Sequence, residues 1–275
     1  MRDTSGMPAD EHGEAALPPA DSHPRAAFIA HLGDLARPIA RRYFRVPLGV
    51  ERKADESPVT RADRDIETAL RTEIRNSFPA DGLFGEEHGT DNLQAPRVWV
   101  VDPIDGTKSF ISGMPIFGTL VAVVENGVPV VGMIDMPALN ERWIGASGHA
   151  TTFGSVACAT RKGVPLAAAT LYATSPDLFG GEDRRRFEAV STRVAMRRFG
   201  GDCYAYALLA SGFVDAVIET GLAPYDYLAM VPIIEGAGGR ISDWSGQALG
   251  LQSAGDVVAA GSPELHAELV SLLRA

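Results

Sequence analysis

The sequence predicts an α+β fold in which helices and sheets form separate layers. Two helical segments come first, short apolar strands joined by tight turns follow, and helices then alternate with strands to the end of the chain. The length of 275 residues allows one or two domains, each large enough to bury a sizeable core. Strands that pair in hairpins favour this layered arrangement over one parallel sheet.

The N-terminal part consists of a tail and two predicted helices. Residues 1–22 are polar and rich in Ala, Pro, Asp and Glu, a composition typical of a disordered tail, so the folded part is expected to span 23–275. Apolar residues recur at helical spacing over about 25–44 and again over 61–76. The polar segment 53–60 between these helices is predicted to be a loop.

Short runs of β-forming residues predict the strands. Val98–Val101 is apolar and too short for a helix. Phe117–Val124 and Val128–Ile134 flank Asn126-Gly127, a dipeptide typical of β-hairpin turns. The further elements are expected in this order: a strand at 142–145, a helix at 201–211, a strand at 213–219, a helix at 225–237, strands at 241–244 and 257–260, and a helix at 264–273.

Composition and charge exclude several classes of protein. Hydrophobic residues make up 45% and charged residues 22% of the chain, which excludes a largely disordered protein. With 25 Lys and Arg against 35 Asp and Glu, the net charge of −10 argues against nucleic acid and anionic membranes as partners. The basic cluster Arg184–Arg186 is predicted to be a solvated helix face.

Cysteine use and the absence of targeting signals indicate a cytoplasmic protein. No run approaches the ~20 apolar residues of a membrane-spanning helix, and the N-terminus has no apolar signal core. Cys158 and Cys203 are far apart and fit neither a zinc site nor a disulfide framework, so both are expected to be reduced thiols.

The densest concentration of functional residue types directly follows the strand at 98–101 and reads Asp102-Pro103-Ile104-Asp105-Gly106-Thr107. Two carboxylates at a strand end can converge on one point, and with a backbone carbonyl they offer the oxygen ligands that hard divalent cations need. Gly106 permits close approach to a ligand, and the N–H groups of Gly106 and Thr107 can hold a phosphate oxygen at the start of a predicted short helix. Turn composition explains each of these residues separately, so both interpretations stay open at this point.

Three further segments place acids at the ends of predicted elements. Glu86 and Glu87 follow a short apolar strand at 82–84, although adjacent acids are also common on solvated surfaces. Asp226 begins the helix at 225–237, where an acid can simply complement the helix dipole. Asp63 lies in the first turn of the helix at 61–76, where an exposed acid is the alternative.

Together these four segments resemble the inositol monophosphatase family of magnesium-dependent phosphomonoesterases. The motifs of that family occur in the order GEE, DPIDGT and a late WD-type element, and here they are Gly85-Glu86-Glu87, Asp102–Thr107 and Tyr225-Asp226. Tyr225 replaces the Trp of many members, and the acid after it is unchanged.

The resemblance extends from about Phe28 to Leu273 and implies a layered αβαβα fold. The site would lie between an N-terminal α+β half, about 23–150, and a C-terminal α/β half, about 151–275. A homodimer is implied as well.

The resemblance also implies residue roles. The metal ligands, with Mg²⁺ as the cofactor, would be Glu86, Asp102, the Ile104 carbonyl, Asp105 and Asp226. Asp63 and Thr107 would orient and deprotonate the attacking water, and Lys53 lies where the family often has a mobile basic residue. The residues implied in substrate binding are Glu86, Ile104, Asp105, Gly106, Thr107, Gly200, Gly201, Asp202, Glu219 and Asp226. Cations in the site agree with the chemistry, because so many carboxylates in one pocket repel one another unless they are neutralised.

Two more stretches, Asp105–Ile111 with Phe117–Leu120 and Gly201–Tyr206, resemble the histidinol-phosphate phosphatase branch of the family. They imply hydrolysis of L-histidinol phosphate by direct attack of water, with the acids Asp202 and Glu219 suited to its cationic end. Core packing is the alternative for Gly201–Tyr206, and a helix-dipole role is the alternative for Asp202. The competing functions are hydrolysis of inositol monophosphate, a sugar phosphate or a nucleotide phosphate, and a catalytically silent regulatory role.

Overall fold

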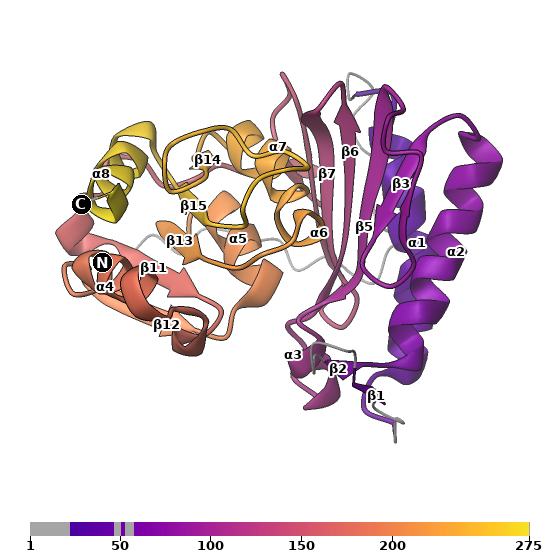
Figure 1. The fold of residues 1–275 in the computed structure, drawn as a ribbon, viewed down its shortest axis with the longest axis horizontal. Coiled ribbons are helices and arrows are strands. Elements are labelled where there is room, and N and C mark those ends of the chain that lie inside the picture. The colour runs from indigo at the N-terminus through magenta and orange to yellow at the C-terminus, as the bar shows by residue number, and fades with distance from the viewer. Residues whose placement is uncertain (1–22, 47–50, 53–57, 275) are drawn as a thin grey trace.

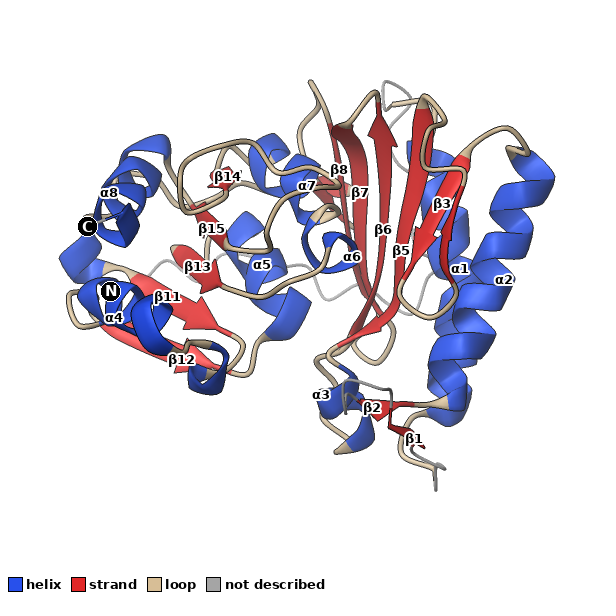
Figure 2. Cartoon of the chain, in the orientation of Figure 1, coloured by secondary structure: helices blue, strands red, loops and turns tan. Residues whose placement is uncertain are grey.

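The computed structural model describes residues 23–46, 51–52 and 58–274, and it consists of helices and sheets in alternating layers (Figure 1). From right to left in Figure 1, the layers are two helices, a large sheet, a group of helices, a second sheet and two outer helices. This is the layered αβαβα arrangement of an α+β protein, so the predicted fold class is confirmed (Figure 2).

The large sheet contains eight strands in the order β10-β9-β8-β7-β6-β5-β3-β4. All neighbouring pairs are antiparallel except β3 with β5. The Asn126-Gly127 turn joins β6 to β7, as predicted. In chain order the strands are β3 (Gly82–Gly85), β4 (Gly89–Asp91), β5 (Arg97–Asp105), β6 (Gly118–Glu125), β7 (Val128–Met136), β8 (Glu141–Ala146), β9 (Thr152–Phe153) and β10 (Val156–Ala157).

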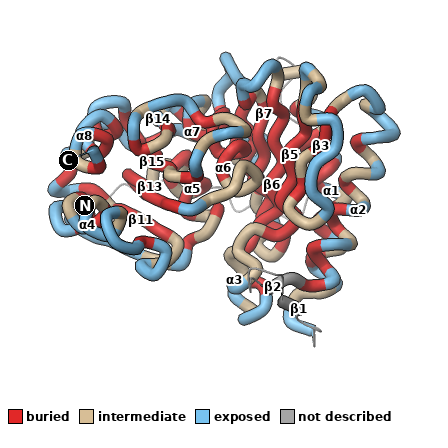
Figure 3. The backbone as a smooth tube through the Cα atoms, in the orientation of Figure 1, coloured by how far each residue is buried: buried red, intermediate tan, exposed pale blue. Residues whose placement is uncertain are grey.

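Two long helices, α1 (Ala26–Tyr43) and α2 (Arg61–Ser77), cover the outer face of the large sheet, close to their predicted bounds. Their apolar stripes and the facing strand residues form one buried core (Figure 3). On α2 this stripe includes Ile66, Leu70 and Ile74, which are at most 1% exposed. Burial of these stripes on the sheet is the main reason that two amphipathic helices form here.

The second sheet has the order β12-β11-β13-β15-β14. Its strands are β11 (Thr170–Ala173), β12 (Met196–Phe199), β13 (Ala216–Glu219), β14 (Arg240–Ser242) and β15 (Val257–Ala260). β11 pairs in parallel with β12 and β13, and the remaining pairs are antiparallel.

Helices α5 (Asp202–Ala210), α6 (Pro224–Tyr227) and α7 (Met230–Gly236) fill the layer between the sheets, and α4 (Gly181–Ser191) and α8 (Pro263–Arg274) form the outer layer. The smaller elements are α3 (Thr107–Ile111), the strand pair β1 (Glu51–Arg52) and β2 (Pro58–Val59), and the 3₁₀ turns Leu166–Ala168 and Pro176–Leu178.

None of the helices in the described part of the chain is long and apolar enough to cross a membrane. Cys158 and Cys203 are both free.

Several expected elements differ from the structure. The helix predicted at 225–237 is divided into α6 and α7 around Leu228. Pro232 explains the break, because a proline has no N–H for the carbonyl four residues earlier and its ring crowds that carbonyl. The strand predicted from residue 213 begins at Ala216, since the N–H groups of Phe213 and Val214 bond to the Leu208 carbonyl at the end of α5.

The loop predicted at 53–60 is wrong for Pro58–Val59, which pairs with Glu51–Arg52 as a short antiparallel ladder. Such two-residue strands are too short to give a periodic pattern in a sequence. Residues 53–57 of that segment, with Lys53, lie outside the described residues, as does the predicted tail 1–22.

His266 on α8 makes the stability of the fold sensitive to acid. Its side chain is buried, its Nε2 lies 2.9 Å from Ser242 Oγ, and burial, with a smaller effect of Arg240, lowers its pKa from 6.5 to about 4. Between these pH values the unfolded chain binds a proton that the folded chain does not, so the free energy of unfolding falls as pH decreases from 6.5 to 4. At ~1.4 kcal/mol per pKa unit, the loss is on the order of 2–3 kcal/mol.

We expect His266→Gln, which has no titrating group, to lose less stability over this pH range than the wild-type protein. Urea unfolding at a series of pH values measures the difference. Parallel curves for the two proteins would contradict a buried neutral imidazole.

Candidate active site

A register shift in β5 brings two acids to the same side of the strand. The structure extends β5 through the Asp-Pro-Ile-Asp segment, which the sequence suggested would follow the strand. Asp102 pairs with Leu120 and Asp105 with Gly118, so three steps on β5 match two steps on β6. In a regular strand, residues three apart point to opposite faces. The extra residue on β5, which acts as a β-bulge, lets Asp102 and Asp105 point to the same side of the sheet.

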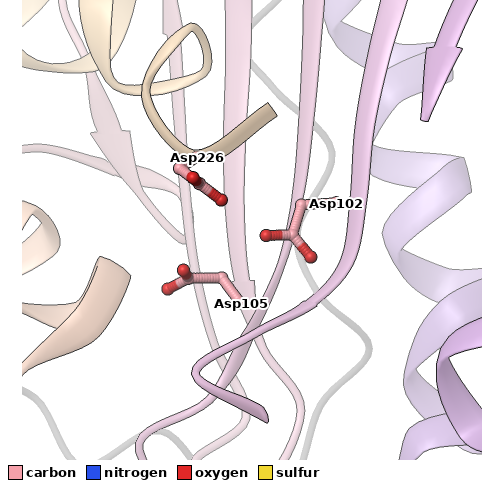
Figure 4. Close-up of side chains that lie close together, drawn as sticks. All are labelled: Asp102, Asp105 and Asp226. Atoms are coloured by element: carbon pink, nitrogen blue, oxygen red, sulfur yellow. The ribbon is translucent and has the colours of Figure 1, made fainter. Parts of the chain in front are cut away.

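Asp226 completes a trio of acids with Asp102 and Asp105. Each of the three residues offers one carboxylate oxygen, and these oxygens all lie within 4.8 Å of one another. Figure 4 shows the three side chains gathered between β5 and the short helix α6 that carries Asp226. The N–H of Ala223 donates to Asp226 Oδ2 at 2.7 Å, which fixes this carboxylate at the start of α6.

The protonation of the trio reflects burial and mutual repulsion. The pKa of Asp102 is raised well above its usual value, first by burial and then by Glu86, Asp105 and Asp226. The pKa of Asp105 is raised to about 8 by burial and by the charges of Asp202 and Asp226. A divalent cation would relieve this repulsion, and an all-oxygen donor set is what Mg²⁺ or a similar hard cation prefers.

Glu86 and Asp63 lie beside the trio. Glu86 raises the pKa of Asp102 through its charge and through a side-chain hydrogen bond, so the two carboxyl groups are neighbours. Asp63 on α2 is 1% exposed, so the alternative interpretation of Asp63 as an exposed first-turn acid is wrong. Burial raises its pKa, and Glu86 adds a smaller increase.

Asp63 also closes the N-terminus of α2. Its Oδ2 accepts hydrogen bonds from the Thr60 N–H at 2.9 Å and the Thr60 hydroxyl at 2.5 Å. Its Oδ1 is buried and has no hydrogen-bond partner among the described residues. One oxygen of Asp63 is therefore used in capping while the other remains available to a ligand.

Thr107 is the first residue of α3, two positions after Asp105 at the end of β5. Its hydroxyl donates to the Ile104 carbonyl at 3.1 Å, which keeps the side chain beside the predicted carbonyl ligand. A carbonyl oxygen has two lone pairs, so this bond leaves one for another partner.

Contacts from α5 hold the Asp105–Ser109 segment. The Cys203 N–H donates to Asp105 Oδ2 at 2.6 Å, and the Ser109 hydroxyl donates to Asp202 Oδ2 at 2.7 Å. Gly106 has a φ of +80°, and a Cβ there would lie 2.9 Å from Asp202 Oδ2, so only glycine fits this position without strain. The close neighbour of Gly106 is the Asp202 side chain, and the approach of a ligand to Gly106 stays a prediction.

Glu219 ends β13 and is 1% exposed. Its Oε1 accepts from the Thr174 N–H at 2.8 Å and the Thr174 hydroxyl at 2.9 Å, whereas its buried Oε2 has no hydrogen-bond partner in the described structure. Burial raises its pKa to about 8, and the charges of Asp105 and Asp202 contribute to the increase. Glu219 and Asp202 thus belong to the same acidic region as the trio.

The remaining predicted binding residues, Gly200 and Gly201, form the turn from β12 into α5. Sequence reasoning did not identify Thr60, Thr174 or Glu67 as supports of the acids. Thr60 could have been found, because Thr and Asp three residues apart at the start of an amphipathic helix are typical of a helix cap. Glu67 had a weaker signal. It lies with Asp63 on the helical stripe that continues through the apolar residues Leu70 and Ile74, so an acid is unexpected there.

Comparison with known proteins agrees with this architecture. A model of the inositol monophosphatase family matches residues 21–275. The chain is 46% identical over 251 residues to the bifunctional phosphatase IMPL2, chloroplastic, of Arabidopsis thaliana. That alignment covers 88% of this chain and 72% of the Arabidopsis protein. It is 35% identical over 262 residues to a histidinol-phosphatase of Mycobacterium tuberculosis, with 92% and 99% covered.

Among solved structures, an inositol monophosphatase from Zymomonas mobilis aligns with a TM-score of 0.82 and 44% sequence identity. The alignment covers 89% of this chain and 95% of the other. The chain therefore belongs to the inositol monophosphatase family and is a phosphatase.

Proposed function

We propose that this phosphatase hydrolyses L-histidinol phosphate to L-histidinol and phosphate, with Mg²⁺ as its cofactor. The observation that carries the proposal is the pair Asp202 and Glu219, two acids outside the Asp102, Asp105 and Asp226 trio but electrostatically linked to it. Histidinol phosphate has a phosphate monoester at one end and an ammonium group with an imidazole at the other. Acids next to a phosphate site suit such a substrate, whereas inositol would need donors and acceptors for several hydroxyl groups.

The residues present fit a magnesium site. Asp102, Asp105 and Asp226 supply three converging carboxylates, and Glu86 and the Ile104 carbonyl complete the proposed ligand set. When bound, the cation would lower the pKa of a water and neutralise phosphoryl oxygens. The carboxylates would hold the cation and, through their negative charge, would set how tightly it binds.

Asp63 and Thr107 are proposed to handle the attacking water. The unpartnered Oδ1 of Asp63 can accept its proton, and the capping bonds to Oδ2 prevent the carboxylate from rotating away. The Thr107 hydroxyl can orient the same water after exchanging its bond to the Ile104 carbonyl. A side-chain nucleophile is not needed in this reaction, because water attacks phosphorus directly.

The phosphate end of the substrate is proposed to lie at the proposed metal ligands with Gly106 and Thr107. The cationic end would then face Asp202 and Glu219, next to the Gly200-Gly201 turn. The homodimer implied by the family resemblance remains a prediction. The cytoplasmic location, inferred from cysteine use and targeting signals, remains a prediction as well.

Hydrolysis of inositol 1-phosphate is the second candidate, because the Zymomonas mobilis structure that aligns with this chain is an inositol monophosphatase. Side-by-side turnover of L-histidinol phosphate and inositol 1-phosphate with Mg²⁺ separates the two functions, and a chelator control tests the metal requirement. We expect the higher kcat/KM for histidinol phosphate. A preference for inositol 1-phosphate would reverse the assignment, and no turnover of any phosphomonoester would support a silent regulatory protein.

Substitution of Asp202 and Glu219 tests the same proposal within one protein. Each charge-assisted hydrogen bond contributes about 1.5–3 kcal/mol, which corresponds to roughly 10–150-fold in an equilibrium constant. We therefore expect Asp202→Asn and Glu219→Gln each to lower kcat/KM for histidinol phosphate by about that factor.

Hydrolysis of a generic phosphomonoester whose leaving group carries no charge should change much less in these two variants. Glu188→Gln, at an exposed position on α4, is the matched control and should leave both substrates unaffected. Equal losses on both substrates would mean that Asp202 and Glu219 support the fold or the metal, and would leave the substrate assignment without this basis.

A further inference from the structure

Glu67 is a buried acid on α2 that the proposed reaction does not use. It lies one helical turn after Asp63, and its side chain is 0% exposed. Burial of a carboxylate costs free energy unless hydrogen bonds and charges compensate for it. Its partners therefore indicate why an acid occupies this position on an otherwise apolar face.

The partners of Glu67 lie in the turn that follows β3. Its Oε2 accepts a hydrogen bond from the Glu87 N–H at 2.6 Å, and its Oε1 accepts one from the His88 N–H at 3.2 Å. These are the two peptide groups directly after Glu86. One buried carboxylate thus holds the backbone of the Glu86–His88 turn against α2.

Arg71, one helical turn further along α2, completes this arrangement. Its Nη1 donates both to Glu67 Oε1 and to the Gly89 carbonyl, each at 3.0 Å. The guanidinium balances the charge of Glu67 and joins it to the end of the same turn. Arg71 therefore compensates for the buried negative charge of Glu67, and the two backbone N–H groups determine where the Glu67 carboxylate lies.

The turn also rests directly on Glu67. A Cβ built on Gly85 would lie 1.9 Å from Glu67 Oε1, so the backbone passes closer to the carboxylate than any side chain allows. On the other side of Glu86, its N–H donates to the Val101 carbonyl of β5 at 3.2 Å. The backbone of Glu86 is thus held on both sides, at its own N–H by β5 and at the following N–H, that of Glu87, by Glu67.

We propose that Glu67 is a positioning residue that sets the divalent-cation affinity of the site by holding the Glu86 backbone in register with Asp102. The inference rests on the proposed role of Glu86 as a metal ligand. Residues that orient metal ligands without touching the metal change metal affinity or activity by about 10–100-fold when replaced. A purely structural role for the Glu67–Arg71 pair would instead change the stability of the metal-free protein and leave its response to metal unaltered.

Glu67→Gln tests this proposal, because it keeps the size of the side chain but replaces one acceptor oxygen with an NH₂ group that cannot bond to a backbone N–H. We expect the affinity for Mn²⁺, used as the probe and measured from the EPR signal of the free ion, to fall by about 10-fold or more. The Mg²⁺ concentration for half-maximal hydrolysis should rise by a similar factor, and saturating Mg²⁺ should restore most of kcat. Glu67→Asp, which keeps the charge but shortens the side chain, is measured in the same way and covers the case in which Glu67→Gln does not fold.

Two reference variants separate the possible outcomes. Glu73→Gln, further along α2 and paired at the surface with His31, should bind Mn²⁺ like the wild-type protein. Glu86→Gln should lose Mn²⁺ affinity, and if it does not, the proposed ligand role of Glu86 fails. If Glu86→Gln loses affinity while the Glu67 variants show only a lower unfolding temperature, the positioning role of Glu67 is overturned and the proposed function is not.

Discussion

Replacement of Asp102 with asparagine is expected to abolish hydrolysis of every phosphomonoester substrate. Asp102 is 2% exposed, belongs to the carboxylate trio, and would lose a full ligand charge with little change in volume. Removal of one donor to a transition state costs about 10²–10³-fold in kcat in other enzymes. Loss of a charged ligand to a divalent cation should exceed this, because it weakens cation binding as well as charge stabilisation.

The metal-free stability of Asp102→Asn distinguishes a lost ligand from a damaged fold. A carboxyl group whose folded pKa is raised contributes stability at low pH and loses it as pH rises, so Asp102 costs stability at neutral pH. The asparagine variant should therefore unfold in chelator at a temperature no lower than the wild-type protein. Its stabilisation by Mg²⁺ in thermal denaturation should be smaller, and full activity at ordinary Mg²⁺ concentrations would contradict the ligand assignment.

The layered fold could be predicted because its main elements carry strong local patterns. The stripes of α1 and α2 repeat every three to four residues, and Asn126-Gly127 sets the register between two long strands. The elements that the sequence analysis missed are short or exposed. β12 buries none of its four residues, so it has no apolar pattern that separates it from a loop. α4 buries only three of its eleven residues, so the sequence indicated only its solvated face at Arg184–Arg186 and not its bounds.

The acids of the candidate site could be named from the sequence, but their geometry could not. Asp102 and Asp105 share one side of β5 only because of a register shift that depends on the pairing with β6. Asp202 reaches the trio because Ser109 and Gly106, nearly a hundred residues away in sequence, leave room for its carboxylate and bind it. Contacts of this kind are set by tertiary packing and leave no local pattern.

The proposed role of Thr107 in orienting the attacking water leads to the second large effect. Thr107→Ala removes the hydroxyl that lies at 3.1 Å from the Ile104 carbonyl and leaves the carbonyl and the carboxylates in place. General acid–base assistance is typically worth about 10²–10⁴-fold, so kcat should fall by that factor. Mn²⁺ affinity, measured from the EPR signal of the free ion, should stay near the wild-type value because no proposed ligand is removed.

A serine at this position separates chemistry from packing. Thr107→Ser keeps the hydroxyl but loses the methyl group, so it should recover most of the activity lost in Thr107→Ala. Ser112→Ala, which removes another hydroxyl bonded to a carbonyl just after α3, is the matched control and should leave kcat unchanged. If Thr107→Ala turned over within a few-fold of the wild-type protein, or if serine did not rescue it, Thr107 would act through packing alone, and Asp63 with its unpartnered Oδ1 would have to orient the water without it.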